Sequence, residues 1–216
     1  MIVTRRALAA ALSLAALAGL ASPPAGRAEA QSAVAPLLAK PVSLPDMALG
    51  SAKAPVTIYE YASMSCPHCA AFEENVFPML KSKYIDSGKL RFVFREFPLD
   101  IKAAAASMLA RCIAGDDATK YFDAVEQLFK VQEQLMEHTI DTLNLIGKQQ
   151  SGMSEAAVEA CEKDQVLLDK LSADAKYAYD ELKVDATPTF FINGERLKGA
   201  MSFEEIDGKI RSLLRK

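Results

Sequence analysis

The sequence predicts an α/β fold in which a βαβ unit and a ββα unit are separated by a long helical segment. Two runs rich in β-forming residues, 56–61 and 90–97, flank a helical pattern. Helical periodicity then continues from residue 100 to residue 184, and a hairpin signal followed by one amphipathic helix closes the chain. The 216 residues, 50% of them hydrophobic, suffice for one domain with a large insertion.

Residues 1–30 have the features of a secretory signal peptide. Arg5 and Arg6 form the charged start, and residues 7–21 are apolar and free of charge. Ala-Glu-Ala at 28–30 is a small-x-small site, so we expect cleavage after Ala30. The apolar run is shorter than the ~20 residues of a spanning helix, which disfavours the alternative of a membrane anchor. The sequence therefore predicts export to an oxidising compartment.

Residues 31–54, rich in Ala, Pro, Ser and Lys, are interpreted as an N-terminal tail. We expect an edge strand near 41–44 and a turn at 50–53. The tail is too short to form a domain of its own. The first half of the folded domain is therefore expected over 55–99.

The βαβ unit follows from local patterns. The run 56–61 is apolar on both faces, as expected of a buried central strand. The helix after it has an apolar stripe that Pro78 is expected to interrupt. The run 90–97 supplies the second strand, and a crossover of this length makes the two strands parallel.

The segment 100–184 lacks proline and is interpreted as an all-helical insertion domain. Asp100 caps its first expected helix, which stops at Gly115. The expected helices are 101–114, 119–137, 140–150, 154–161 and 165–183.

Residues 185–216 form the second half of the interrupted domain. A strand is expected over 189–192, a two-residue turn at Asn193-Gly194, and a partner strand over 196–199. Ser202 and Glu205 have the spacing of a capping box for a last amphipathic helix.

Cys66 and Cys69 stand between the first strand and its helix. This order places Cys66 at a helix N-terminus, where free backbone N–H groups and the helix dipole favour an anion. The thiolate is the nucleophile, and cysteines in such settings have pKa values lowered to about 3.5–7.5. A protonated His68 would add positive charge beside the sulfur. The spacing lets Cys69 reach Cys66, so the pair can cycle between dithiol and disulfide.

A βαβ unit with CxxC at the start of its helix and a later ββα unit is the arrangement of the thioredoxin fold. Thr187-Pro188 immediately precedes strand 189–192, where this fold places a cis-proline loop beside the disulfide. Glu60 is a charge within an apolar strand, as expected of a buried acid that exchanges a proton with Cys69. The alternative for Glu60 is a surface position on an edge strand.

The other two cysteines, Cys112 and Cys161, lie in the helical segment. An even count in an exported chain favours pairing, and CxxC is too tight for an ordinary structural bridge. We therefore expect a redox pair Cys66–Cys69 and a structural disulfide Cys112–Cys161, with free buried thiols as the alternative for the latter. Zinc is disfavoured, because no second CxxC or pair of histidines stands at ligand spacing.

Together these features resemble the bacterial DsbA-type periplasmic thiol:disulfide oxidoreductases, in particular the α-proteobacterial branch with a second disulfide. The resemblance covers roughly residues 45–214 and rests on Cys66-Pro67-His68-Cys69, residues 92–100 and residues 187–194. It implies that Cys66 is an exposed nucleophile that forms mixed disulfides with substrates. It also implies that Cys69 is the buried partner that resolves them.

The resemblance implies roles for four further residues. His68 would stabilise the Cys66 thiolate and make the disulfide oxidising. Pro188 would shape the groove that holds the substrate backbone, lined by Pro67 and Thr187. The usual partner is a quinone-linked, DsbB-like membrane oxidase, and no cofactor or metal is implied beyond the cysteines. Thr187 departs from the valine of the best-known oxidases and is common in isomerases.

The sequence thus predicts a monomeric periplasmic enzyme that donates the Cys66–Cys69 disulfide to thiols of exported, folding proteins. The alternatives are a disulfide isomerase or reductase, a redox-inert chaperone-like binding module and, more weakly, copper binding by the dithiol. The short tail, which cannot be a dimerisation domain, favours the oxidase. A formal charge of −3 without a basic stripe argues against nucleic acid as a partner.

Overall fold

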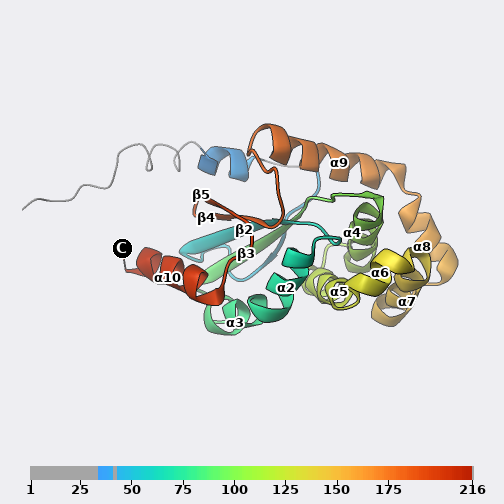
Figure 1. The fold of residues 1–216 in the computed structure, drawn as a ribbon, viewed down its shortest axis with the longest axis horizontal. Coiled ribbons are helices and arrows are strands. Elements are labelled where there is room, and N and C mark those ends of the chain that lie inside the picture. The colour runs from blue at the N-terminus through green and yellow to red at the C-terminus, as the bar shows by residue number, and fades with distance from the viewer. Residues whose placement is uncertain (1–33, 41–42, 216) are drawn as a thin grey trace, which may run out of the picture.

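The computed structural model describes residues 34–40 and 43–215, so the predicted signal peptide lies outside the described residues. The described chain forms a five-stranded sheet in the order β1-β3-β2-β4-β5, with helices on both faces and a group of helices at one end (Figure 1). This is the thioredoxin fold with the inserted helices that the sequence predicts.

The centre of the sheet is the predicted parallel pair. β2 (Val56–Ala62) and β3 (Leu90–Glu96) pair in parallel from Val56 opposite Leu90 to Ala62 opposite Glu96. The crossover consists of α2 (Pro67–Asn75), α3 (Phe77–Leu80) and a π-helical turn (Lys81–Ile85). The helix breaks at Val76, two residues before Pro78, because proline lacks the N–H that a continuous helix would donate to the carbonyl four residues earlier. Pro78 stands instead in the first turn of α3, where that N–H is not needed.

The hairpin and last helix follow the prediction closely. β4 (Thr189–Ile192) pairs antiparallel with β2 and with β5 (Glu195–Lys198), which begins one residue earlier than expected. Asn193 and Gly194 both have positive φ, as a two-residue hairpin turn requires. The capping box of Ser202 and Glu205 opens α10 (Phe203–Leu214).

The N-terminal tail differs from the prediction. Residues 34–39 form a short helix, and the edge strand β1 (Met47–Leu49) pairs antiparallel with β3. The prediction of a strand near 41–44 is wrong for residues 43 and 44, the part of this range that the structure describes. The Asp174 carboxylate accepts the backbone N–H groups of Ser43 and Leu44 at 2.6 and 2.9 Å. Those groups are therefore not available to a neighbouring strand.

The inserted segment is helical, as expected, but it is divided differently. Its elements are α4 (Ile101–Ala114), α5 (Ala118–Lys130), α6 (Gln132–Glu137), α7 (Thr139–Ser151), α8 (Glu155–Glu162) and α9 (Gln165–Asp180). The single helix expected over 119–137 breaks at Val131, whose φ and ψ are −108° and 25°. Cys112 on α4 and Cys161 on α8 are joined by a disulfide with a Cα–Cα distance of 6.3 Å.

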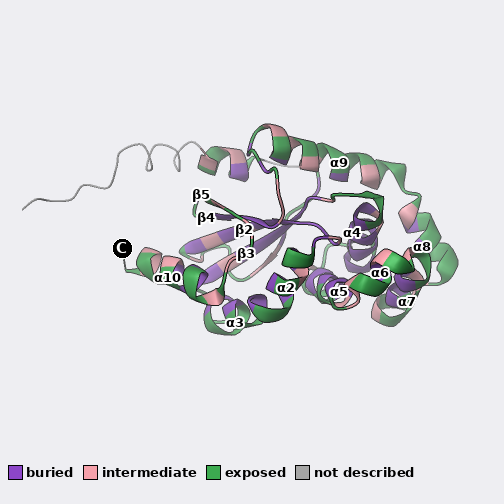
Figure 2. Cartoon of the chain, in the orientation of Figure 1, coloured by how far each residue is buried: buried purple, intermediate pink, exposed green. Residues whose placement is uncertain are grey.

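Two apolar clusters cover the faces of the sheet. On one face α2, α3 and α10 pack against β2 and β3, and the same cluster extends to α4, α5 and α7. On the other face α9 and the helix at 34–39 pack against the opposite sides of β2 and β4. Figure 2 shows the resulting pattern, with the strands mostly buried and the outer surfaces of α8, α9 and α10 exposed.

A buried ion pair fixes the insertion to the sheet. The carboxylate of Glu96, at the end of β3, accepts hydrogen bonds from Arg111 Nε at 2.5 Å, Arg111 Nη2 at 2.7 Å and the Tyr121 hydroxyl at 2.6 Å. These partners come from α4 and α5. Separating these groups would leave an unpaired charge in the interior, which is costly. The network therefore holds α4 and α5 against the end of β3, which pairs with the end of β2.

Candidate active site

Cys66 and Cys69 lie where the chain passes from β2 into α2. Cys66 is the N-cap residue of α2, and Pro67 is its first residue. The Cys66 Sγ accepts the backbone N–H of Cys69 at 3.3 Å, and Cys69 is fully buried. Both cysteines are free thiols, so the structure has the reduced form of the pair.

The Cys66 side chain is less accessible than expected. Only 4% of the residue is exposed, although the sequence implied an exposed nucleophile. The cause is the loop at Thr187, whose carbonyl oxygen accepts the Cys66 S–H at 3.3 Å. The Thr187–Pro188 peptide bond is cis, and Pro188 is buried. Residues far apart in sequence therefore cover the sulfur.

The two thiols have opposite pKa shifts. The pKa of Cys66 is lowered to about 5, first by a hydrogen bond from the Cys69 side chain, against an opposing effect of burial. The backbone N–H groups of Cys69 and His68 lower it further. The pKa of Cys69 is raised, mainly by burial. At neutral pH the pair is therefore a Cys66 thiolate beside a Cys69 thiol, and the S–H contact to the Thr187 carbonyl belongs to the protonated form of Cys66.

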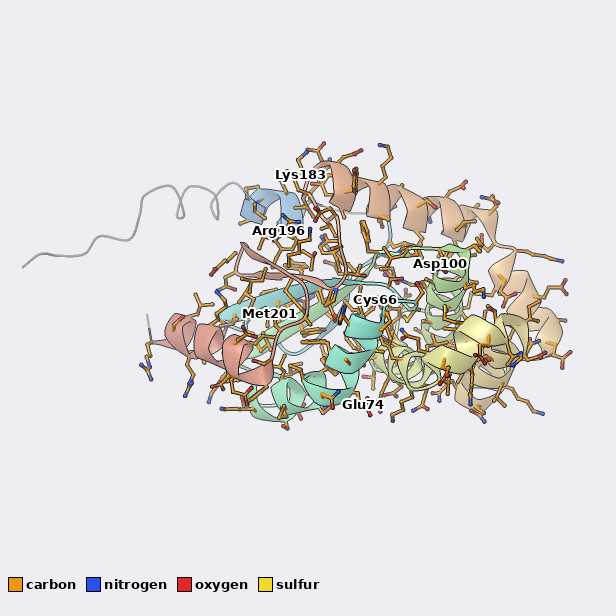
Figure 3. All side chains as sticks on the ribbon, in the orientation of Figure 1. Cys66, Glu74, Asp100, Lys183, Arg196 and Met201 are labelled. Carbon is orange, nitrogen blue, oxygen red and sulfur yellow. A yellow bond between two sulfur atoms is a disulfide. The ribbon has the colours of Figure 1, made fainter. Side chains whose placement is uncertain are left out.

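His68 contributes to this site through its backbone. Its side chain is exposed and lines an open groove of about 270 Å³ together with Phe72, Val76 and Met201. Figure 3 shows Cys66 at the start of α2, between Met201 on one side and Asp100 on the other. Pro67 is exposed beside Cys66, and neither residue is among those that line this groove.

Glu60 is a buried carboxyl next to Cys69. It lies in the central strand β2, opposite Phe94 and Phe190, so the alternative of a surface position on an edge strand is wrong. Its Oε2 has no hydrogen-bond partner among the described residues. Burial raises the pKa of Glu60 well above its usual value, with contributions from Glu73 and Cys66. Glu60 can therefore hold a proton at neutral pH.

Glu73 is a second buried carboxyl, and the sequence analysis did not identify it. It lies four residues after Cys69 on α2, and its Oε2 also lacks a partner within the described chain. Burial, followed by the charge of Glu126, raises the pKa of Glu73 to about 8. Glu73 also lines a cavity of about 360 Å³ beside Lys130. The i, i+4 spacing from a buried cysteine was the signal available in the sequence.

The described residues have no arrangement of three or more His, Cys, Asp or Glu side chains that could hold a metal ion. In the same part of the chain, every helix is too short or too polar to cross a membrane. The lowered pKa of the Cys66 thiol and the free Cys69 beside it suit the site to thiol–disulfide exchange, with two carboxyls nearby that can carry protons.

Comparison with known proteins agrees with this chemistry. The thioredoxin family model matches residues 43–212. A protein of Rickettsia conorii, provisionally named a protein-disulfide oxidoreductase, is 34% identical over 152 residues, which are 69% of this chain and 53% of that protein. Disulfide bond formation protein D of Bacillus subtilis is 26% identical over 173 residues, 77% of this chain and 76% of that protein.

Among solved structures, Wolbachia pipientis alpha-DsbA1 superposes with a TM-score of 0.73 at 32% identity, covering 83% of this chain and 95% of that one. The chain spans only about half the length of the rickettsial relatives that it matches. The assignment to a family therefore does not depend on the CxxC motif alone. It also rests on the shared fold and on sequence identity that extends over nearly the whole length of alpha-DsbA1. The chain belongs to the thioredoxin family and, within it, to the DsbA-type oxidoreductases.

Proposed function

We propose that this protein is an exported thiol:disulfide oxidoreductase that donates the Cys66–Cys69 disulfide to thiols of folding proteins. The observation that carries the proposal is the Cys66 sulfur on the first turn of α2, with its pKa lowered to about 5. A stabilised thiolate favours the reduced dithiol, and a pair whose reduced form is favoured is an oxidant.

The reaction then proceeds in two exchanges. A substrate thiolate attacks the Cys66 Sγ of the disulfide, the bond to Cys69 breaks, and Cys69 leaves as a thiolate that must take up a proton. A second substrate thiolate attacks the mixed disulfide and releases Cys66 as a thiolate. The substrate loses two electrons in forming its disulfide, and the Cys66–Cys69 pair gains them.

Glu60 supplies the proton that Cys69 requires. Its raised pKa keeps a proton available at neutral pH, and its charge raises the pKa of Cys69 in turn, as expected of neighbouring groups. Glu73 is coupled to Glu60 by charge and lines the cavity beside Lys130. It therefore returns the proton to Glu60 from solvent.

Substrates bind in the groove between His68 and Met201, with their backbone against the loop of Thr187 and Pro188. After each turnover the pair is a dithiol, so an electron acceptor must regenerate the disulfide. We propose a quinone-linked, DsbB-like membrane protein as this acceptor, a periplasmic location after cleavage at Ala30, and a monomeric state. The family of the chain and the signal-peptide pattern support these assignments.

The test is oxidative refolding of reduced, unfolded ribonuclease by the oxidised protein. We expect stoichiometric transfer of one disulfide per molecule, loss of transfer in Cys66→Ala and retention of transfer in the Cys112→Ala/Cys161→Ala double variant. A wild-type protein that transfers no disulfide would contradict the proposal. If it held the unfolded chain without transfer, and Cys66→Ala did so equally, a redox-inert binding module would replace the oxidase.

Thr187 favours a second candidate activity, disulfide isomerisation. Thr187 lies in the loop that contacts Cys66, and its interaction with the Cys66 sulfur contributes to the lowered pKa of that thiol. Refolding of ribonuclease with scrambled disulfides by the reduced protein measures this activity. Recovery faster than that by reduced glutathione at equal thiol concentration would support it.

A further inference from the structure

The helical insertion holds the loop that carries the redox centre. This loop, residues 63–66, connects the end of β2 to the start of α2. The Ser63 Oγ accepts the backbone N–H of Leu99, just before α4, at 3.2 Å. Within the loop, the Cys66 N–H donates to the Ser63 carbonyl at 3.0 Å. One end of the loop is thus tied to the segment that leads into the insertion.

Gln132 on α6 holds the other end. Its Nε2 donates to the Met64 carbonyl at 2.8 Å and to the Cys66 carbonyl at 3.1 Å. Both partners are carbonyl oxygens, which only accept, so the NH₂ end of the amide must face them. Gln132 is the first residue of α6 and half-buried, and Met64 is buried.

A helix break at Val131 immediately precedes the residue that makes this contact. The periodicity of the sequence favours one helix across this point, yet Val131 leaves helical geometry and α6 begins anew at Gln132. The residue after the break is the one whose amide reaches the active-site loop. A local departure from the preferred structure thus coincides with a contact to a loop 66 residues earlier in the chain.

The carbonyl that Gln132 binds belongs to the residue that carries the nucleophile. The same Cys66 carbonyl accepts the Ala70 N–H at 3.1 Å, in the first turn of α2. The Cys66 Sγ accepts the Cys69 N–H at 3.3 Å. Such hydrogen bonds weaken steeply when their angle or length changes. Fixing the backbone of Cys66 therefore fixes the sulfur over its donors.

We propose that Gln132 is a positioning residue for the redox centre: its amide holds the Met64 and Cys66 carbonyls and so keeps the Cys66 sulfur on the N–H groups of the first turn of α2. The inference deepens the proposed function, because it names how the insertion tunes the same cysteine. Among the hydrogen bonds of the described residues, none joins the Gln132 side chain to the Cys66 sulfur, so its effect on that sulfur passes through the backbone.

The test is Gln132→Met, which keeps the length of the side chain and removes both donors. We expect the pKa of Cys66, followed by the ultraviolet absorbance of its thiolate, to rise by about half a unit to one unit. We expect the equilibrium of the pair with glutathione to shift by about three- to tenfold toward the oxidised protein. Gln134→Met, at an exposed position of the same helix, should leave both values unchanged.

Unchanged pKa and glutathione equilibrium in Gln132→Met, even with a lower melting temperature, would overturn the proposal, because a merely structural contact lowers stability alone. If Gln132→Met does not fold, the same pKa and glutathione equilibrium are measured for Gln132→Asn, whose side chain is one methylene too short to reach both carbonyls. The same outcomes then support or overturn the proposal. The pKa comparison needs no oxidase activity. A reducing wild-type pair would refute the proposed function, while the difference between variants would still decide the role of Gln132.

Discussion

The backbone N–H of Cys69 donates to the Sγ of Cys66 at 3.3 Å. The residue that closes the disulfide therefore also stabilises the thiolate when the disulfide is open. The Cys69 side chain adds a hydrogen bond of its own, and this is the largest cause of the lowered pKa of Cys66. The Cys69 S–H is lost when the disulfide forms, and a neutral disulfide sulfur is a weaker acceptor than a thiolate, so both interactions favour the reduced state.

Alkylation of the reduced protein should follow the titration of Cys66. With the pKa at about 5, we expect the rate with iodoacetamide to be nearly constant from neutral pH down to about 6 and to fall below 5. Cys69, with its pKa raised by burial, should remain unmodified in that range. Mass spectrometry of the alkylated peptides distinguishes the two cysteines. A rate that rises steadily from pH 6 to pH 9 would show an ordinary thiol.

Stability should depend on pH differently in the two redox states. The pKa of Cys66 is lower in the folded protein than in the unfolded chain, so the unfolded chain binds more protons between the two values. The free energy of unfolding of the reduced protein, relative to the oxidised one, should therefore rise with pH above about 5 and lose this gain as pH falls through that value. Denaturant unfolding of both forms across this range measures the difference. A difference that is independent of pH would contradict the assignment.

Glu60→Gln should slow turnover without abolishing binding. The amide cannot give a proton to the Cys69 thiolate, so we expect disulfide transfer to slow by about tenfold or more, most strongly at alkaline pH where free protons are scarce. Glu73→Gln should slow it less, because Glu73 acts through Glu60. Glu74→Gln is the matched control, since Glu74 neighbours Glu73 on α2 but is exposed. Equal rates in all three variants would exclude a proton role for the buried pair.

Removal of the Cys112–Cys161 disulfide should cost stability and spare activity. The bridge closes a loop with a sequence separation of 49, for which the chain-entropy model gives about 4 kcal/mol. Cys161 packs in a cluster with Leu44, Ala104 and Met108, apart from the cluster that contains Cys66. We expect the double alanine variant to lose about 2–5 kcal/mol in the free energy of unfolding, measured by denaturant titration. Loss of disulfide transfer at temperatures where the variant is folded would contradict the expectation that the Cys112–Cys161 disulfide contributes to stability and not to activity.

The features that could be predicted from sequence are those with local causes. Runs of apolar and β-forming residues predict β2 and β3, Pro78 predicts the interruption of the helix between them, and Asn193-Gly194 predicts the hairpin turn. The cysteine pair was visible for the same reason, because its spacing and its place between strand and helix are both local.

The features that sequence reasoning missed depend on contacts between distant residues. The edge strand was misplaced because Asp174 binds the backbone of Ser43. The burial of Cys66 comes from Thr187, and the break at Val131 accompanies the reach of Gln132 to the active-site loop. The periodicity of apolar residues within one segment does not indicate which distant residues will contact it.

The most direct test of the central claim is the reduction potential of the Cys66–Cys69 pair, measured against glutathione buffers. The stabilised Cys66 thiolate predicts a potential well above about −270 mV, the value of thioredoxin. The protein would then oxidise the thiols of folding substrates. A potential near or below about −270 mV would contradict the assignment as a disulfide donor and would make the protein a reductant.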